Sequence, residues 1–257
     1  MPAARAEKKP AAKKVPGAKP TPVPAAKKTK KSAVDPTNPQ RVETILQRLA
    51  EHYPNAVCAL HHRNAWELTV ATILSAQCTD VRVNMVTPAL FKRFPTPQAM
   101  AKASQAEVEE MIRTTGFFRN KAKNIIGAAQ LVVAEFGGKV PQTMEELIEL
   151  GGVGRKTANV VLGNAFNINV GVVVDTHVMR LSHRLGLTKH RAPEKIEPDL
   201  MKLVPQNDWT LFSHLLIWHG RRRCFARKPD CENCEVRKFC PQIGVKIQPR
   251  MDTDGHG

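Results

Sequence analysis

The sequence lacks long apolar runs and is poor in aromatic residues, with one tyrosine, three tryptophans and nine phenylalanines among its 257 residues. Its longest apolar stretches, Val170–Val174 and Leu211–Trp218, are far shorter than the roughly 20 residues needed to cross a bilayer. Nothing near the N-terminus has the apolar core of a secretory signal. We therefore expect a soluble protein that is neither secreted nor held in a membrane.

Alternating strand patterns are also lacking, because the one β-branched run, at 170–174, is short. From residue 38 onward, apolar residues instead recur at helical spacing. Capping and pattern signals predict helices that begin near Asn38-Pro39, Asn64 (running from Trp66 to Cys78), Thr79 or Asp80 (continuing to Phe94 despite Pro88), Ser104, Phe118 (to Phe136), Thr143, Arg155, Thr176, Pro193 and Asn207. The sequence thus predicts an all-α fold, long enough for one large or two modest domains.

Acidic residues are scarce, since 23 Asp and Glu face 39 Lys and Arg and the formal net charge is +16. The first 33 residues carry +9 of this charge, and the remainder, at +7, is also basic, which indicates a polyanionic partner. This Lys/Ala/Pro segment has no aromatic residue and its prolines prevent a continuous helix, so we expect residues 1–33 to be a disordered tail. The tail is either a non-specific tether to DNA or a dispensable, solvated extension, and both interpretations stay open.

Without export to an oxidising compartment, clustered cysteines favour a metal centre over disulfides. Four cysteines lie within seventeen residues in the spacing C-x6-C-x2-C-x5-C: Cys224, Cys231, Cys234 and Cys240. Zinc sites usually contain two C-x2-C pairs, whereas the single pair here is Cys231 and Cys234. The uneven gaps favour a [4Fe–4S] cluster over zinc, with disulfides third, but spacing alone leaves the choice open.

The glycine-rich segment Gly152–Thr157 (GVGRKT) lacks the glycine that precedes the lysine of a Walker A loop, and it follows a capped helix rather than a strand. The expected structure is helix, glycine hairpin, helix. Bare glycine N–H groups at a helix N-terminus can bind phosphate, which is typical of a helix-hairpin-helix motif that holds the DNA backbone. A plain αα-hairpin with a glycine C-cap is the alternative, and the basic composition favours the phosphate-binding motif.

Two polar residues near this motif are candidates for chemistry. Lys156 lies in the first turn of the second helix, where opposition to the helix dipole favours a neutral, nucleophilic amine. A solvated or phosphate-facing lysine is the simpler interpretation. Asp175 follows the apolar run and precedes the helix at Thr176, so it can be an N-cap, a catalytic carboxylate or both.

Four motifs follow one another along the chain: ILSAQCTDVRVN (73–84), LGGVGRKTANVVL (150–162), VVDTHVMRLSHRLGL (173–187) and HGRRRCFARKPDCENCEVRKFC (219–240). Together they resemble endonuclease III, a family of helix-hairpin-helix DNA glycosylases, from about residue 40 to residue 240. The resemblance implies a bifunctional DNA glycosylase and AP lyase of base excision repair. Such an enzyme removes oxidised pyrimidines from duplex DNA through a lysine Schiff base and cuts the strand by β-elimination.

The resemblance also implies two helical domains that flank a DNA-binding cleft. One is a six-helix barrel at residues 58–169, with the helix-hairpin-helix at about 143–163. The other is a discontinuous helical domain at 34–57 and 170–247 that carries a [4Fe–4S] cluster on the four cysteines. Residues 248–257 are expected to form a flexible tail.

Family motifs imply roles for individual residues. Lys156 is implied to be the nucleophile and Asp175 its carboxylate partner. Gln77 is implied to fill the gap left by a flipped base, and His177 to contact a phosphate near the lesion, although a solvated glutamine and a structural histidine are the alternatives. Further DNA contacts are implied for the hairpin residues Gly152, Val153, Gly154 and Arg155.

The sequence departs from the family pattern at two positions. Phe117 stands where the family usually has a leucine in the loop that wedges between bases. An aromatic ring can also act as a wedge, so a DNA contact is still expected, but the opposite-base preference stays open. Gly151 replaces the proline of the hairpin motif, which is expected to make the hairpin more flexible.

Other functions are compatible with parts of this pattern. A monofunctional glycosylase of the same superfamily is one alternative. An adenine-mismatch glycosylase is another, but it would lack the catalytic lysine and would carry a further C-terminal domain. A non-catalytic DNA-binding iron–sulfur protein would have no use for Asp175, and a cluster-based electron carrier would not need a basic surface. We therefore expect a bifunctional enzyme that acts as a monomer on damaged double-stranded DNA. It would work in the cytoplasm or nucleoid of a bacterium, or in the nucleus of a eukaryote.

Overall fold

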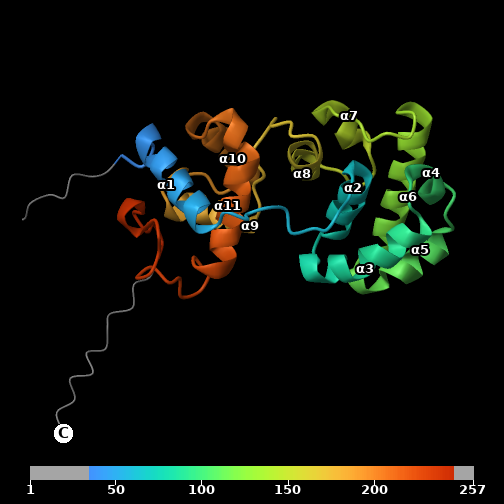
Figure 1. Cartoon of the computed structure of the whole chain (residues 1–257), viewed down its shortest axis with the longest axis horizontal. Helices are drawn as coiled ribbons and strands as arrows, with labels where there is room; N and C mark the ends of the chain where they lie inside the picture. Colours follow the sequence, from blue (N-terminus) through green and yellow to red (C-terminus); the bar gives the residue numbers. More distant parts are fainter. Residues whose placement is uncertain (1–34, 246–257) are drawn as a thin grey trace, which may run out of the picture. The chain divides into compact units, whose positions relative to one another are not determined.

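The structure is a computed structural model that describes residues 35–245. Figure 1 shows its helices in chain order. They are α1 (Pro39–His52), α2 (Ala65–Leu74), α3 (Asp80–Arg93), α4 (Pro97–Ala101), α5 (Gln105–Ile112), η1 (Arg113–Thr115), α6 (Phe118–Glu135), α7 (Met144–Glu149), α8 (Arg155–Ala165), α9 (Thr176–Arg184), α10 (Pro193–Leu203), η2 (Gln206–Asp208), α11 (Trp209–Arg222) and η3 (Arg237–Phe239), where η marks a 3-10 helix. The tails predicted at 1–33 and 248–257 lie outside the described residues.

The all-α prediction is confirmed, because residues 35–245 contain no β-strand. The predicted caps form where side chains accept the free N–H groups of a first turn. Asn38 accepts from Gln40 in α1, and Thr79 accepts from Arg82 in α3. Ser104 and Thr143 begin α5 and α7 in the same way. None of the helices in the described part of the chain is long and apolar enough to span a membrane.

Two predicted boundaries differ from the structure, and one short helix was not predicted. Helix α2 ends at Leu74 rather than at Cys78, because the chain turns there and Gln77 adopts a left-handed φ of 53°. The five-residue helix α4 was not predicted, since so short a segment carries no periodic pattern. Helix α11 begins at Trp209 rather than at Asn207, because residues 206–208 form a 3-10 turn.

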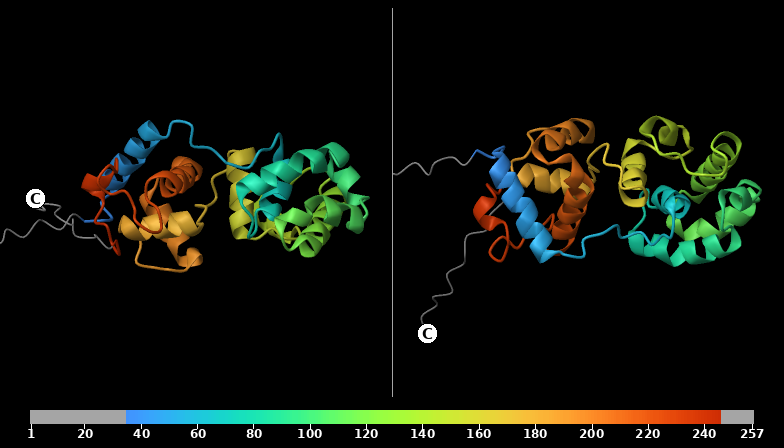
Figure 2. Two further views of the ribbon diagram at one scale, coloured as in Figure 1. Left: turned by 90° about the horizontal axis from the view of Figure 1, so that it is seen from below. Right: turned by 45° about the horizontal axis from the view of Figure 1, so that its top comes forward.

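The buried apolar side chains form two clusters. One is built from α2 to α8 and includes Leu90 and Ile125. The other is built from α1 and α9 to α11 and includes Ile45 and Phe212. The two groups of helices are distinct in Figures 1 and 2, and the chain passes between them before α2 and again after α8. The predicted domain boundaries at residues 57/58 and 169/170 stay a prediction.

Candidate active site

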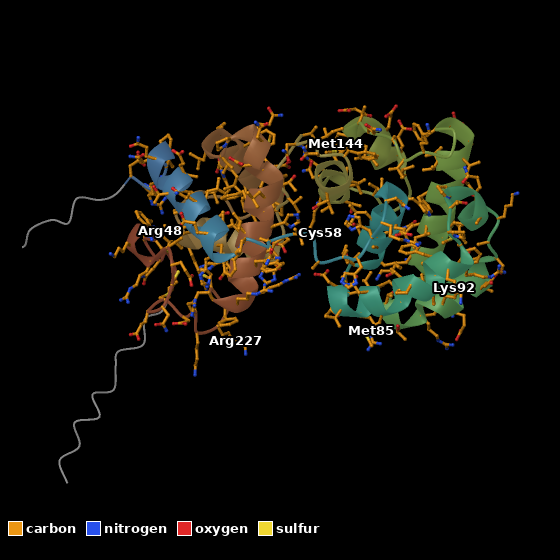
Figure 3. The ribbon with its side chains drawn as sticks, in the orientation of Figure 1. Arg48, Cys58, Met85, Lys92, Met144 and Arg227 are labelled. Atoms are coloured by element: carbon orange, nitrogen blue, oxygen red, sulfur yellow. The ribbon has the colours of Figure 1, made fainter. Side chains whose placement is uncertain are left out.

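A pocket of about 110 Å³ collects side chains from both groups of helices. Lys156 of α8 and Asp175, which precedes α9, both line it. Cys58, labelled in Figure 3 on the connection from α1 to α2, lines it as well. The remaining wall combines apolar and polar side chains, among them Val160, Val173, Ile217, Trp218, Ser75, Asp80, Asn164, Thr210, Ser213, His214 and Arg221. The structure therefore brings together the two residues that the sequence offered as candidates for catalysis.

The hairpin between α7 and α8 positions Lys156. The Val153 N–H donates to the Leu150 carbonyl oxygen at 3.0 Å, and Gly152 has a φ of +79°, which glycine adopts readily. Gly154 precedes α8 without a side-chain cap, so the first N–H groups of that helix have no side-chain acceptor. Lys156 is the second residue of α8 and is exposed; within residues 35–245 its Nζ makes no hydrogen bond or ion pair.

The hairpin glycines also permit close packing against α6. A Cβ atom at Gly151 would lie 3.0 Å from the carbonyl oxygen of Asn124, and one at Gly152 would lie 3.0 Å from the side-chain nitrogen of the same residue. Gly154, by contrast, faces open space. Glycine at 151 thus fits a tight contact with α6, and the added flexibility expected there stays a prediction.

Asp175 is held rigidly by the helix that it caps. Its Oδ1 accepts the N–H groups of His177 and Val178, both at 2.8 Å, so the N-cap interpretation is confirmed. No hydrogen bond engages its Oδ2 within the described residues. The preceding apolar run is buried, and the Val173 N–H donates to Ser213 Oγ at 3.1 Å. One carboxylate oxygen is therefore used for orientation, and the other is left for interactions in the pocket.

Arg155 forms an ion pair that the sequence did not reveal. Its Nε and Nη2 donate to the two carboxylate oxygens of Glu197 at 2.8 and 3.0 Å, and Asn159 Nδ2 donates to the same carboxylate at 2.9 Å. Glu197 belongs to α10 and is buried, so the start of α8 is tied to the second cluster. A Cβ atom at Gly171 would collide with this carboxylate, which explains the glycine in the apolar run.

Two further polar pairs line the pocket and were also missed. Arg221 of α11 donates to Asp80 of α3 at 2.7 Å, which joins the two groups of helices. His214 donates from Nε2 to Asn164 Oδ1 at 2.7 Å, and burial lowers the pKa of His214 to about 4. The imidazole is therefore neutral at physiological pH. Each of these pairs joins residues distant in sequence, so no local signal could have predicted them.

Gln77 and Phe117 do not line the pocket; each is exposed in a turn outside it. Both have left-handed backbones, with φ of 53° and 49°, which is uncommon for residues other than glycine. Phe117 is 64% exposed. The two side chains are thus presented to solvent by tightly defined turns.

His177 is half-buried and does not line the pocket. Its Nδ1 accepts a hydrogen bond from Arg180 Nη2 at 3.1 Å, and the same Nη2 donates to the Gly220 and Cys224 carbonyl oxygens. Burial lowers the pKa of His177. These contacts favour the structural interpretation, and a phosphate contact stays a prediction.

The four clustered cysteines line a common pocket beside α9, with the apolar side chains of Leu181, Leu185 and Val236. All four are free thiols, and Arg184 Nη1 donates to Cys224 Sγ at 3.2 Å. Burial raises the pKa of Cys234 to about 12 and also raises those of Cys231 and Cys240. Four thiols that converge on one pocket, beside an arginine, fit an anionic metal–sulfur group.

A second set of metal-ligand types, His219, Cys234 and Glu235, lies with its ligand atoms within 4.8 Å of one another. These side chains already have protein partners. His219 approaches Tyr53 Oη with Nδ1 (3.1 Å) and Cys234 Sγ with Nε2 (3.4 Å), while Glu235 pairs with Arg223 at 3.1 Å. The set is therefore a hydrogen-bonded network beside the cysteines rather than a separate metal site.

Residues 70–206 match the HhH-GPD superfamily of base excision DNA repair proteins. The chain is 59% identical over 202 residues to the endonuclease III of Synechocystis sp., which covers 79% of this chain and 92% of that protein. This chain belongs to the endonuclease III family. The endonuclease III of Escherichia coli K12 is 40% identical over 196 residues, covering 76% of this chain and 92% of that protein.

Solved structures agree with this assignment. A non-covalent endonuclease III–DNA complex and a trapped endonuclease III–DNA covalent intermediate each have a TM-score of 0.75, 40% identity, and coverage of 80% of this chain and 96% of that chain. A thermostable thymine-DNA glycosylase at 21% identity, with a TM-score of 0.71, shares the fold. The family and fold predicted from the four motifs are confirmed.

Proposed function

We propose that this endonuclease III family member is a bifunctional DNA glycosylase and AP lyase that removes oxidised pyrimidines from duplex DNA. One observation carries the proposal: Lys156 and Asp175, from separate elements, line a single pocket. A lysine amine without a protein partner, in the same pocket as a carboxylate of fixed orientation, is suited to Schiff-base chemistry. The similarity to a trapped covalent endonuclease III–DNA intermediate supports the same class of reaction.

Base release begins when the damaged nucleotide leaves the base stack and its sugar enters the pocket. Nζ of Lys156, once it has given up a proton, attacks C1′ of the sugar while the glycosidic C1′–N bond breaks, and the base departs with that electron pair. Asp175 stabilises the positive charge that develops on the sugar, and it receives the proton that the attacking nitrogen sheds. A water molecule is not needed as the nucleophile.

Strand cleavage follows from the same covalent adduct. The sugar ring opens to a Schiff base between C1′ and Lys156, which acidifies the proton on C2′. Removal of that proton forms a C2′–C3′ double bond and breaks the C3′–O bond, so the 3′ phosphate leaves. Hydrolysis of the Schiff base by water then frees Lys156 for another cycle.

Duplex binding is assigned to the exposed backbone and turns around the pocket. The N–H groups of Gly152, Gly154 and Arg155 bind a phosphate where α8 begins, whereas that of Val153 already donates to the Leu150 carbonyl oxygen. The guanidinium of Arg155 is held by Glu197, so that residue contributes its backbone rather than its side chain. Gln77 and Phe117 enter the base stack from their turns. His177 contributes by supporting Arg180 and α11, and a direct phosphate contact is a secondary expectation.

We also propose that Cys224, Cys231, Cys234 and Cys240 hold a [4Fe–4S] cluster. The four thiols share one pocket, and their uneven spacing, with a single C-x2-C pair, favours the cluster over a zinc ion. The cluster's contribution would be structural, because it would cross-link the basic segment 221–228 to the rest of the protein. Equal amounts of iron and sulfide in the purified protein are expected, and one zinc per chain would contradict the assignment.

The test of the proposed function is borohydride trapping on a duplex with one oxidised pyrimidine, with the wild type beside Lys156→Gln. We expect a covalent protein–DNA adduct in the wild type alone, and no base release by the variant. Base release without an adduct would mean a monofunctional enzyme that uses water. Binding without either product would mean a different lesion specificity or a non-catalytic DNA-binding protein.

A further inference from the structure

A buried lysine lies beneath the two exposed turns that contain Gln77 and Phe117. Lys121, in the first turns of α6, is 4% exposed. Its Nζ donates to the Leu74 carbonyl oxygen at 2.8 Å and to the Thr115 carbonyl oxygen at 2.8 Å. Leu74 is the last residue of α2, three positions before Gln77, and Thr115 is the last residue of η1, two positions before Phe117. One ammonium group therefore links the two residues that precede the turns.

The position of Lys121 at the end of α2 suits a cation that can donate two hydrogen bonds. The last carbonyl groups of a helix have no partner within it, and the C-terminus of a helix attracts positive charge. The Lys121 ammonium supplies both a hydrogen-bond donor and a positive charge at the C-terminus of α2. No carboxylate pairs with it within residues 35–245. Burial lowers the pKa of Lys121, so the charge is retained at a cost. An apolar side chain of equal length would fill the space but leave two buried carbonyl groups unpaired.

Lys121 gives the two turns a shared hydrogen-bonded anchor. Gly116 and Phe117 are consecutive left-handed residues, and a Cβ atom at Gly116 would meet nothing within 4 Å. The exposed part of that turn is therefore not fixed by packing at Gly116. The start of that turn is held at Thr115, because its side chain is buried and its Oγ1 donates to the Ile112 carbonyl oxygen. Lys121 connects Thr115 to the end of α2 through its two hydrogen bonds.

We propose that Lys121 is a positioning residue that holds the Gln77 and Phe117 turns at a set separation, so that both side chains enter the base stack together. This inference rests on the proposed function. Extrusion of a paired base costs the free energy of unpairing and unstacking. Insertion of two side chains offsets that cost only if both enter the base stack at the right separation. Lys121 touches neither DNA nor the reacting atoms in this account.

The test compares two steps that depend differently on base extrusion. Single-turnover base release is measured on an oxidised pyrimidine paired in duplex DNA, and borohydride trapping is measured on a preformed abasic site, which has no base to extrude. For Lys121→Met we expect base release to slow about 10-fold to 100-fold and trapping at the abasic site to slow less than about 3-fold. Lys123→Met, at an exposed position on the same helix, is the matched control and should match the wild type in both assays.

Each outcome decides the inference. Equal slowing of both steps would mean that Lys121 supports only the stability of the fold, which would overturn the proposal. Wild-type rates for both steps would overturn it as well. If Lys121→Met does not fold, Lys121→Arg decides instead, because it keeps charge and donors in a different geometry. It should then slow base release selectively, by a smaller factor. Failure of the wild type to form any adduct would instead contradict the proposed function itself.

Discussion

Lys156 and Asp175 line one pocket, but the two regions that carry them hold their side chains in different ways. The hairpin before α8 fixes a backbone of glycines packed on α6 and leaves the Lys156 amine without a protein partner. The turn before α9 does the reverse, because two N–H groups lock the carboxylate of Asp175 at 2.8 Å each. A nucleophile must follow the sugar as the bond forms, whereas a charge-stabilising carboxylate must stay in place. The contrast matches the two proposed roles.

The largest expected effect comes from removing the negative charge of Asp175 while keeping its side chain in the same orientation. In Asp175→Asn the amide oxygen can still accept both N–H groups, so the cap and the fold persist. We expect single-turnover base release to slow by roughly 10²-fold to 10⁴-fold, with DNA affinity within a few-fold of the wild type.

Asp175→Ala separates the two contributions of this residue, because it loses the cap as well as the charge. Its free energy of unfolding should fall by about 1 kcal/mol, whereas that of Asp175→Asn should stay close to the wild type. Near-normal base release by Asp175→Asn would restrict Asp175 to helix capping.

The next prediction concerns Glu197, whose ion pair with Arg155 ties the start of α8 to α10. In Glu197→Gln the ion pair with Arg155 loses its charge at a buried position, although Arg155 is itself half exposed. We expect a loss of about 1–2 kcal/mol in the free energy of unfolding, measured by urea denaturation. Glu110→Gln removes an exposed pair with Arg113 and should cost less than about 0.5 kcal/mol. Equal losses in the two variants would mean that the Arg155 pair contributes no more than a surface pair.

Local features of the candidate site could be predicted from sequence, and its long-range contacts could not. The cap at Asp175 and the hairpin at Gly152 follow from residues adjacent in the chain, and so does the family resemblance. Lys121 gave no signal, because its partners are backbone carbonyl groups and one of them lies 47 residues away. Glu197 is likewise 42 residues from Arg155. Such contacts arise only when helices pack, which a pattern of apolar residues does not specify in enough detail.

A pH-dependent loss of stability is expected from His214, which lies on α11 and lines the pocket. His214 has a pKa of about 4 against an ordinary 6.5, so as pH falls below 6.5 the unfolded chain binds a proton that the folded protein does not. Stability is therefore lost between pH 6.5 and about 4, and this group accounts for about 2 kcal/mol of loss by pH 5. His214→Gln should flatten the fall in urea midpoint over this window. His61→Gln, at an exposed position, should leave it unchanged, and identical pH profiles for all three proteins would contradict the assignment.

The backbone geometry of the hairpin is tested by comparing alanine at position 152 with alanine at position 154. Gly152→Ala places a Cβ at a φ of +79° and 3.0 Å from the Asn124 side chain, so we expect a loss of about 1–2 kcal/mol in stability. Gly154→Ala has an ordinary φ and open space, so its stability should stay within about 1 kcal/mol. Duplex affinity, measured by fluorescence anisotropy, should fall more for Gly152→Ala. Equal behaviour of the two variants would argue against a specific backbone geometry at Gly152.

The most direct test of the account is to locate the covalent bond. Wild-type protein is trapped with borohydride on a duplex containing one oxidised pyrimidine, the adduct is digested, and the modified peptide is sequenced by mass spectrometry. The account predicts that the sugar remnant is attached to Nζ of Lys156. Attachment to any other lysine, or to the N-terminal amine, would contradict the pocket of Lys156 and Asp175 as the centre of the reaction.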